Sequence, residues 1–213
     1  MDTTKIIYLY GAGGHGRVVR DIAEARGIRV AAFIDDHAAP ALPCPVLPHL
    51  PSEGTPSLVV SIGDNRVRRC VVRKLQAQHR GRRWASLIHP SAVISPSARI
   101  GEGSVVMPGA VINAGAVIGR HCIVNTGASV DHDCKVGDYC HIAPRAALCG
   151  AVQLGEGVLF GVGACAVPAV CIGPWALVGA GAAVIRDIEA HSIVVGVPAR
   201  PLHPLSSLCQ NAT

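Results

Sequence analysis

Apolar residues recur at every sixth position of this chain from Ile88 to Val178, and nothing interrupts the count. The recurring positions are Ile88, Ile94, Ile100, Val106, Ile112, Ile118, Val124, Val130, Val136, Ile142, Leu148, Leu154, Phe160, Ala166, Ile172 and Val178. From Ile94 on, the residue two places earlier is small, mostly Ala, Cys or Val. A period of six fits neither the 3.6-residue period of a helix nor the alternation of a strand. It predicts a parallel β-helix, in which three short strands form one coil and successive coils stack.

Counting by eighteen maps the outer faces of this β-helix. Residues eighteen apart stack at a strand spacing of about 4.8 Å, so the sixteen hexads give about five coils. The residue before each recurring position points outward, because neighbours along a strand alternate. The three faces then present Val105, Ile123, His141, Leu159 and Leu177; Arg99, Val117, Lys135, Gln153 and Cys171; and Val93, Val111, Ser129, Ala147 and Cys165. The first face is nearly all aliphatic, so we expect partner subunits to cover it in a closed homotrimer.

Residues 1–86 lack the six-residue period and predict a separate domain. A buried strand is predicted at Lys5–Tyr10, and the glycine-rich run Gly11–Gly16 follows it directly, before a predicted helix at Arg17–Arg26. Glycines at such a turn let the backbone approach a phosphate, which the helix N-terminus attracts. The run therefore indicates a nucleotide site. The alternative is that the glycines serve only the close packing of the helix.

An acidic pair follows the second predicted strand of this domain. Val30–Ile34 ends in Asp35 and Asp36, where a carboxylate could accept hydrogen bonds from a ribose or a base. What remains of the domain is a Pro-rich loop (Pro40–Pro56), a strand at Leu58–Ile62, a helix at about Asp64–Gln78 and a short segment at Trp84–Leu87. This is one half of a dinucleotide fold, a Rossmann-like half domain, so we expect it to bind one nucleotide and not NAD.

Composition limits the classes of function. A formal charge of +5 over 213 residues mildly favours anionic ligands such as phosphates and is too small for a nucleic-acid-binding surface. Nine cysteines without a signal-peptide pattern predict a cytoplasmic protein with free thiols. Gly157–Ile185 carries no charge and is long enough to span a membrane, but its glycines, prolines and hexad register predict packed coils and no membrane insertion.

A histidine between two aspartates marks a candidate catalytic corner. Asp131, His132 and Asp133 fall in a predicted turn between two faces, where a carboxylate could fix the tautomer of an imidazole that acts as general base. A solvated polar turn is the alternative. His141 lies on the apolar face, where an unpaired ring is costly, so we expect it to have a ligand or a partner. The register places His132 opposite His141, and a shared site therefore requires a subunit contact.

Six motifs together resemble the NeuD/PglD family of sugar O- and N-acetyltransferases. They are YGAGGHGRV at 10–18, FIDD at 33–36, SIGDN at 61–65, LIHPSAVISPSA at 87–98, NTGASVDHDC at 125–134 and VGVPAR at 195–200. The resemblance implies a Rossmann-like nucleotide-sugar domain at 1–86 and a left-handed β-helix acetyltransferase domain at 87–202, assembled as a homotrimer that serves bacterial glycan biosynthesis. The segment 203–213 looks unrelated, and we predict that it is a disordered tail.

The same resemblance implies an activity and its residues. The activity is acetyl transfer from acetyl-CoA, without a metal, to the amino group of a nucleotide-linked 4-amino-4,6-dideoxy sugar. His132 matches the catalytic base, and Asp133 its acidic neighbour, which is usually Glu in the family. Gly13, Gly14, His15, Asp35, Asp36 and Gly63 match the nucleotide-sugar positions, whereas His141, Val162 and Ala180 match acetyl-CoA positions. Backbone N–H groups near Gly150 are a candidate oxyanion site.

Several other functions remain open at this point. O-acetylation of a sialic acid or another sugar belongs to the same family. A gamma carbonic anhydrase-like metal enzyme would use His121, His132 and His141, although the closely spaced histidine pair of that family is absent. A thiol mechanism through Cys149 and a non-enzymatic nucleotide-binding scaffold are the last two alternatives. The inward thiols of Cys122, Cys134 and Cys140 are expected to be small core residues.

Overall fold

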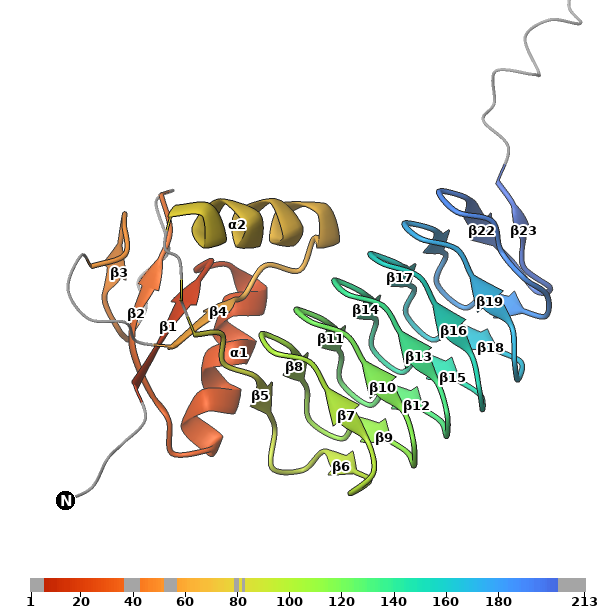
Figure 1. Ribbon diagram of the computed structural model, residues 1–213, viewed down its shortest axis with the longest axis horizontal. Helices are drawn as coiled ribbons and strands as arrows, with labels where there is room; N and C mark the ends of the chain where they lie inside the picture. Colours follow the sequence, from red (N-terminus) through yellow and green to blue (C-terminus); the bar gives the residue numbers. More distant parts are fainter. Residues whose placement is uncertain (1–5, 37–42, 52–56, 79–80, 82, 203–213) are drawn as a thin grey trace, which may run out of the picture.

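The structure is a computed structural model that describes residues 6–36, 43–51, 57–78, 81 and 83–202. A small α/β part is followed by a long stack of coils, and the two lie end to end (Figure 1). The predicted boundary after residue 86 lies close to β5 (Leu87–Ile88), the first strand of the stack. The predicted tail, 203–213, lies outside the described residues.

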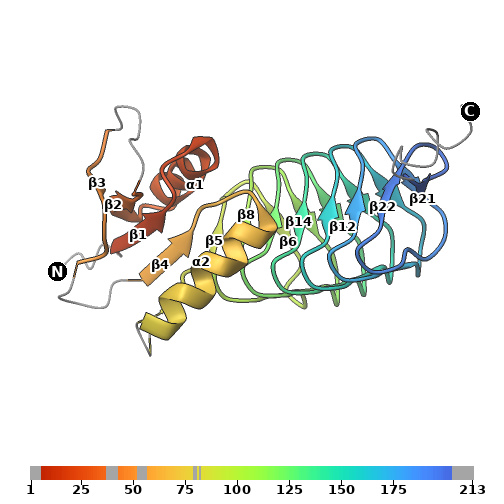
Figure 2. The same cartoon turned by 90° about the horizontal axis from the view of Figure 1, so that it is seen from above.

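The small part is a parallel sheet between two helices. Its strands are β1 (Ile6–Tyr10), β2 (Arg29–Ile34), β3 (Val46–Leu47) and β4 (Ser57–Val60), in the order β3-β2-β1-β4. The helices α1 (Gly14–Ala25) and α2 (Asn65–Gln78) lie on opposite sides of the sheet (Figure 2). Both faces of a parallel sheet are buried in such an arrangement, which explains why its strands are almost wholly apolar.

No described helix is long and apolar enough to cross a bilayer.

Two predictions for this part need correction. The first helix begins at Gly14 and not at Arg17, because the last glycines of the run already form its first turn. The Pro-rich loop contains β3, which pairs with β2 through Phe33 and Ile34. A strand of two residues is too short to show a periodic pattern, so it could not be predicted from the sequence.

The coils form three stacked sheets, as the hexad count predicted. The first sheet contains β5, β8 (Val105–Val106), β11 (Ile123–Val124), β14 (His141–Ile142), β17 (Leu159–Phe160), β20 (Leu177–Val178), β22 (Ile193–Val195) and β23 (Arg200–Pro201). The second contains β7 (Arg99–Ile100), β10 (Val117–Ile118), β13 (Lys135–Val136), β16 (Gln153–Leu154) and β19 (Cys171–Ile172). The third contains β6 (Val93–Ile94), β9 (Val111–Ile112), β12 (Ser129–Val130), β15 (Ala147–Leu148), β18 (Cys165–Ala166) and β21 (Ala183–Val184).

The register of the coils agrees with the predicted one. His141 pairs with Ile123 on one side and Leu159 on the other, each eighteen residues away. The stack is longer than the predicted five coils, because β21 and β22 continue it beyond Val178. Its interior is filled by the recurring residues and by the small residues at the corners, among them the buried thiols of Cys122 and Cys140. All eight described cysteines are free.

The junction between the two parts corrects the prediction for the apolar face. Val105 and Ile123 are each only 1% exposed, and they share a core with Val19 and Ile22 of α1. The first domain of the same chain therefore covers the lower half of this face, whereas the prediction assigned all of it to partner subunits. An apolar stripe shows that something covers it, but the sequence does not show which element does so.

Candidate active site

A cavity of about 610 Å³ opens at the carboxyl ends of β1, β2 and β4. The strand order reverses at β1, because β2 and β3 lie on one side of it and β4 on the other. Parallel sheets bind ligands at such a point. All six predicted nucleotide-sugar residues line it, namely Gly13, Gly14, His15, Asp35, Asp36 and Gly63. Lys74 of α2 also lines it and was missed by sequence reasoning, because a lysine on a helix rich in basic residues gives no sign of a ligand contact by itself.

The glycines of the run divide into two kinds. A Cβ on Gly16 would overlap the carbonyl oxygen of Gly11 and lie 3.2 Å from the ring of Phe33, and Gly11 itself has a φ of +108°. These two glycines are needed for the turn and for close helix packing. A Cβ on Gly13 would meet nothing within 4 Å, so the side of the loop that faces the cavity is open. Close packing therefore accounts for Gly11 and Gly16, whereas the approach of a phosphate to Gly13 stays a prediction.

Asp35 braces the glycine loop. Its Oδ2 accepts a hydrogen bond of 2.8 Å from the backbone N–H of Ala12. The sequence predicted a ribose or base contact for this carboxylate, and the structure adds this contact within the loop. The charges of Asp36 and Asp35 also act on Tyr10, whose pKa is raised by burial first and by these two carboxylates second.

His15 reaches the cavity as a neutral ring. Its Nε2 is buried and has no hydrogen-bond partner among the described residues. Burial, and then the charge of Arg68, lower the pKa of His15 to about 4. The unpaired nitrogen is therefore uncharged at neutral pH and available to a polar group of a ligand.

A second cavity of about 620 Å³ runs along the exposed half of the apolar face. His141, Val162 and Ala180, the three residues predicted to contact acetyl-CoA, all line it. Leu159 and Leu177 lie between them and give the cavity an apolar floor. Gly63 lines this cavity and the first one, so the loop after β4 is a wall that the two cavities share.

His141 has the polar partner that its position demanded. Asn125 Nδ2 lies 3.0 Å from His141 Nε2. An amide nitrogen can only donate, so Nε2 accepts and the neutral ring carries its proton on Nδ1. Burial first, then Arg68 and His15, lower the pKa of His141 to about 4, against a smaller opposing effect of a backbone hydrogen bond with Gly63. Sequence reasoning missed Asn125, which lies sixteen residues before His141 and faces it only once the coils are stacked.

His132 stands at an exposed corner between β12 and β13. Its Nδ1 lies 2.9 Å from Asp133 Oδ2, which fixes the proton on Nδ1 and leaves Nε2 as the acceptor. Asp133 adopts a left-handed φ of 60°, a conformation that Asp tolerates better than most residues. The hydrogen bond to Asp133 first, and then the charge of Asp131, raise the pKa of His132.

Asp131 supports the corner in a different way from Asp133. Its Oδ1 accepts the backbone N–H of His132 at 2.8 Å and the side-chain amide of Asn113 at 2.9 Å. It therefore holds the backbone of the turn, whereas Asp133 holds the ring. Asn113 is a further residue that the sequence pattern did not reveal, since it lies one full coil before Asp131.

The two candidate histidines lie on different sides of the coil. His132 occupies the corner between the second and third sheets, and His141 lies on the first sheet, as predicted. The third histidine of the carbonic anhydrase alternative, His121, is 1% exposed and is enclosed by the rings of Trp84 and Tyr139. Within the described ranges, no three His, Cys, Asp or Glu side chains are arranged to hold a metal ion. The three histidines thus form no ligand set within one chain.

Comparisons with known proteins give matches in both parts of the chain. The family described as the PglD N-terminal domain matches residues 6–75, and the bacterial transferase hexapeptide family (six repeats) matches residues 115–150. A curated UDP-N-acetylbacillosamine N-acetyltransferase of Bacillus subtilis (strain 168) is 41% identical over 113 residues. That match covers 47% of this chain and 50% of the relative, so the chain spans about half the length of this protein.

Two solved structures match over nearly the whole chain. The acetyltransferase domain of PglB from Neisseria gonorrhoeae FA1090 is 39% identical, with a TM-score of 0.87, and the match covers 93% of this chain and 100% of that one. The same domain is also known in complex with acetyl coenzyme A. PerB from Caulobacter crescentus, in complex with CoA and GDP-perosamine, is 44% identical, with a TM-score of 0.86 and coverage of 92% and 97%.

Proposed function

Because the chain belongs to the NeuD/PglD family of sugar acetyltransferases, we propose that it transfers the acetyl group of acetyl-CoA to the amino group of a nucleotide-linked 4-amino-4,6-dideoxy sugar. One observation carries the proposal: Gly63 separates a cavity built like a nucleotide site from an apolar cavity on the coils. A sugar held through its nucleotide in the first cavity would extend past Gly63 toward an acyl donor in the second. A free sialic acid has no nucleotide to fill the first cavity, so N-acetylation is favoured over O-acetylation.

The proposed chemistry uses His132 as general base. Nδ1 donates to Asp133, so Nε2 can take a proton from the sugar amine while the amine nitrogen adds to the thioester carbonyl. The C–N bond forms, the C–S bond breaks, and the proton on His132 passes to the leaving sulfur, so that CoA leaves as the thiol. Gly150 lies directly under the ring, since a Cβ placed there would come 2.5 Å from Nε2. The backbone around Gly150 is therefore near the proposed reaction centre.

A homotrimer is part of this proposal. His132 and His141 lie on different sides of one coil, so a site that uses both needs a corner from one subunit and a face from the next. A closed ring of three subunits would form three such sites.

We also place the reaction in the cytoplasm, because the eight described cysteines are all free thiols, as is usual in a reducing compartment.

A thiol-release assay tests the activity directly. The purified protein is given acetyl-CoA with a panel of UDP-, GDP- and dTDP-linked 4-amino sugars, and release of CoA is measured with a thiol reagent. We expect turnover with one nucleotide series, and the matching nucleoside diphosphate should raise the melting temperature. Turnover of free sialic acid, with no turnover of any nucleotide sugar, would overturn the proposal in favour of O-acetylation.

A further inference from the structure

Arg68 is a buried cation at the junction between the two parts of the chain. It lies near the start of α2, is 1% exposed and makes six hydrogen bonds to other described residues. All six acceptors are neutral oxygens: five backbone carbonyls and the side-chain oxygen of Asn65. A buried charge without a hydrogen-bonded carboxylate is costly, so this guanidinium calls for an explanation beyond packing.

Four of the six acceptors belong to two separate segments that lie next to the cavities. Nη1 donates to the carbonyls of Ile62 at 2.9 Å and Gly63 at 3.0 Å, in the loop that separates the two cavities. Nη2 donates to the carbonyls of Tyr139 at 2.8 Å and Cys140 at 3.4 Å, the two residues before His141. One rigid, planar group thus spans from the shared wall to the strand that carries His141.

The charge of Arg68 also acts on both histidines of the cavities. After burial, it is the largest cause of the low pKa of His15 and of His141. Burial lowers the pKa of Arg68 itself to about 10, which leaves it protonated at neutral pH. The other titratable groups that act on the guanidinium are Cys122, Cys140, Asp64 and Tyr139.

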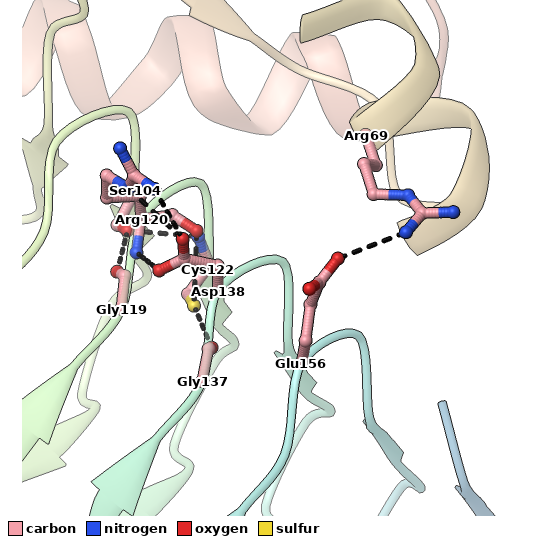
Figure 3. A network of polar contacts seen from close by, with 8 residues as sticks. All are labelled: Arg69, Ser104, Gly119, Arg120, Cys122, Gly137, Asp138 and Glu156. Carbon is pink, nitrogen blue, oxygen red and sulfur yellow. Dashed lines mark hydrogen bonds and ion pairs between the residues drawn. The ribbon is translucent and has the colours of Figure 1, made fainter. Parts of the chain in front are cut away.

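A neighbouring arginine provides a natural comparison. Arg69 also joins α2 to the coils, through an ion pair of 3.1 Å with Glu156 (Figure 3). Its side chain is 29% exposed, and neither Arg69 nor Glu156 lines either cavity. The guanidinium of Arg69 also lies 4.3 Å from the centroid of the Trp175 ring, which lines the apolar cavity. Glu156→Gln therefore removes the attachment between helix and coils without removing the Arg69 side chain from Trp175.

We propose that Arg68 is a positioning residue, which holds the Gly63 loop against the strand of His141 and so keeps the nucleotide cavity and the acyl-donor cavity in a fixed relation. This inference rests on the proposed function for its kinetic consequences only. Arg68 touches neither substrate and acts through the loop and the strand that it joins.

Three variants separate the geometry of Arg68 from its charge. Arg68→Lys keeps a cation, but its single nitrogen cannot reach carbonyls on both sides, so we expect kcat/KM for both substrates to fall by roughly 10- to 100-fold. Arg68→Met removes the charge as well, so the pKa values of His15 and His141, followed by NMR titration, should rise, although burial, the larger cause, still keeps them below the ordinary value of about 6.5. Glu156→Gln should change kcat/KM less than about twofold, even if it lowers the melting temperature.

Each outcome decides the proposal. If Arg68→Lys behaves like Glu156→Gln in kcat, in both KM values and in its pH profile, the proposal is wrong. If Arg68→Met does not fold, Arg68→Lys alone decides. If the wild-type protein turns over no sugar in the panel, the proposed function fails. The histidine titrations and calorimetry with UDP and GDP still test Arg68, and unchanged pKa values and affinities would overturn its role.

Discussion

The ring of His132 rests directly on Gly150, one coil further along the chain. A Cβ at position 150 would lie 2.5 Å from Nε2 and 2.6 Å from Cε1 of the imidazole, so only glycine leaves the ring where it is. This contact predicts that Gly150→Ala displaces the base and lowers kcat by about 100-fold, within the usual range for the loss of a general base. The melting temperature should change little, since His132 is exposed.

A double variant provides the control for Gly150. In the His132→Ala background no ring remains to be displaced, so adding Gly150→Ala should cost almost nothing further. Wild-type turnover by the single Gly150→Ala variant would show that the ring position is not needed.

Asp133 should determine the acid limb of the pH profile. A general base works only when neutral, so activity falls as the pH drops through the pKa of His132, which is raised chiefly by Asp133. Asp133→Asn removes this cause, so the pKa falls and the acid limb of kcat/KM moves to lower pH. The plateau should also drop by roughly 10-fold because the ring is held less firmly. Asp131→Asn retains the partner on Nδ1 and should move the limb less.

Mixed oligomers test whether the site is shared between subunits. His132→Ala and His141→Ala are expected to be poorly active alone, since each damages every site. In a randomly mixed trimer, each mixed ring contains one site with both histidines, so co-expression should restore about a quarter of wild-type activity. Mixing the two separately purified variants without subunit exchange gives the baseline. No recovery after verified exchange would contradict a shared site.

The glycine run can be separated into its two roles by substitution. Gly16→Ala would force a methyl group against the carbonyl of Gly11, so it should destabilise the fold by about 2 kcal/mol in a denaturation experiment. Gly13→Ala has open space around it and should leave stability unchanged. It should weaken binding of the preferred nucleoside diphosphate by roughly tenfold, measured by calorimetry, because the phosphate can no longer approach the loop. Equal affinities of Gly13→Ala and the wild type for the nucleoside diphosphate would show that this loop does not bind the phosphate.

His121 should make the fold sensitive to acid. Its pKa is lowered to about 4, chiefly by burial, and both ring nitrogens lack a partner among the described residues. Below about pH 6.5 the imidazole of His121 binds a proton in the unfolded chain but stays neutral in the native protein. The free energy of unfolding therefore falls by up to about 1.4 kcal/mol per pH unit until about pH 4. His121→Phe, between Trp84 and Tyr139, should reduce this slope while keeping the stability at about pH 8. An unchanged slope would assign the acid sensitivity to other groups.

The coils could be predicted in detail because their pattern is local and periodic. Apolar residues occupy every sixth position from Ile88 to Val178 without interruption. The pairing of His141 with Ile123 and Leu159 follows from this period and from the alternation of side chains along each strand. The same period predicts that His132 lies at a corner. These positions depend on local periodicity and on no contact between distant elements.

The contacts between distant elements were the part that the sequence could not predict. Arg68 is one of several arginines on α2, and only its burial against the coils distinguishes it from the others. Asn125 and Asn113 were hidden for a similar reason, because side chains at coil corners meet across a whole turn of chain. The partner that covers Val105 and Ile123 was assigned to another subunit, although α1 covers them.

The eighteen-residue register also sets how such a protein can evolve. A single inserted residue between His132 and His141 would turn every later outward side chain toward the core, whereas a duplicated coil preserves the register on both sides. Each such duplication beyond Leu159 would lengthen the apolar cavity by about 4.8 Å without moving either histidine. The size of acyl donor that the groove accepts is therefore open to change by gene-segment duplication, while the reaction centre stays fixed.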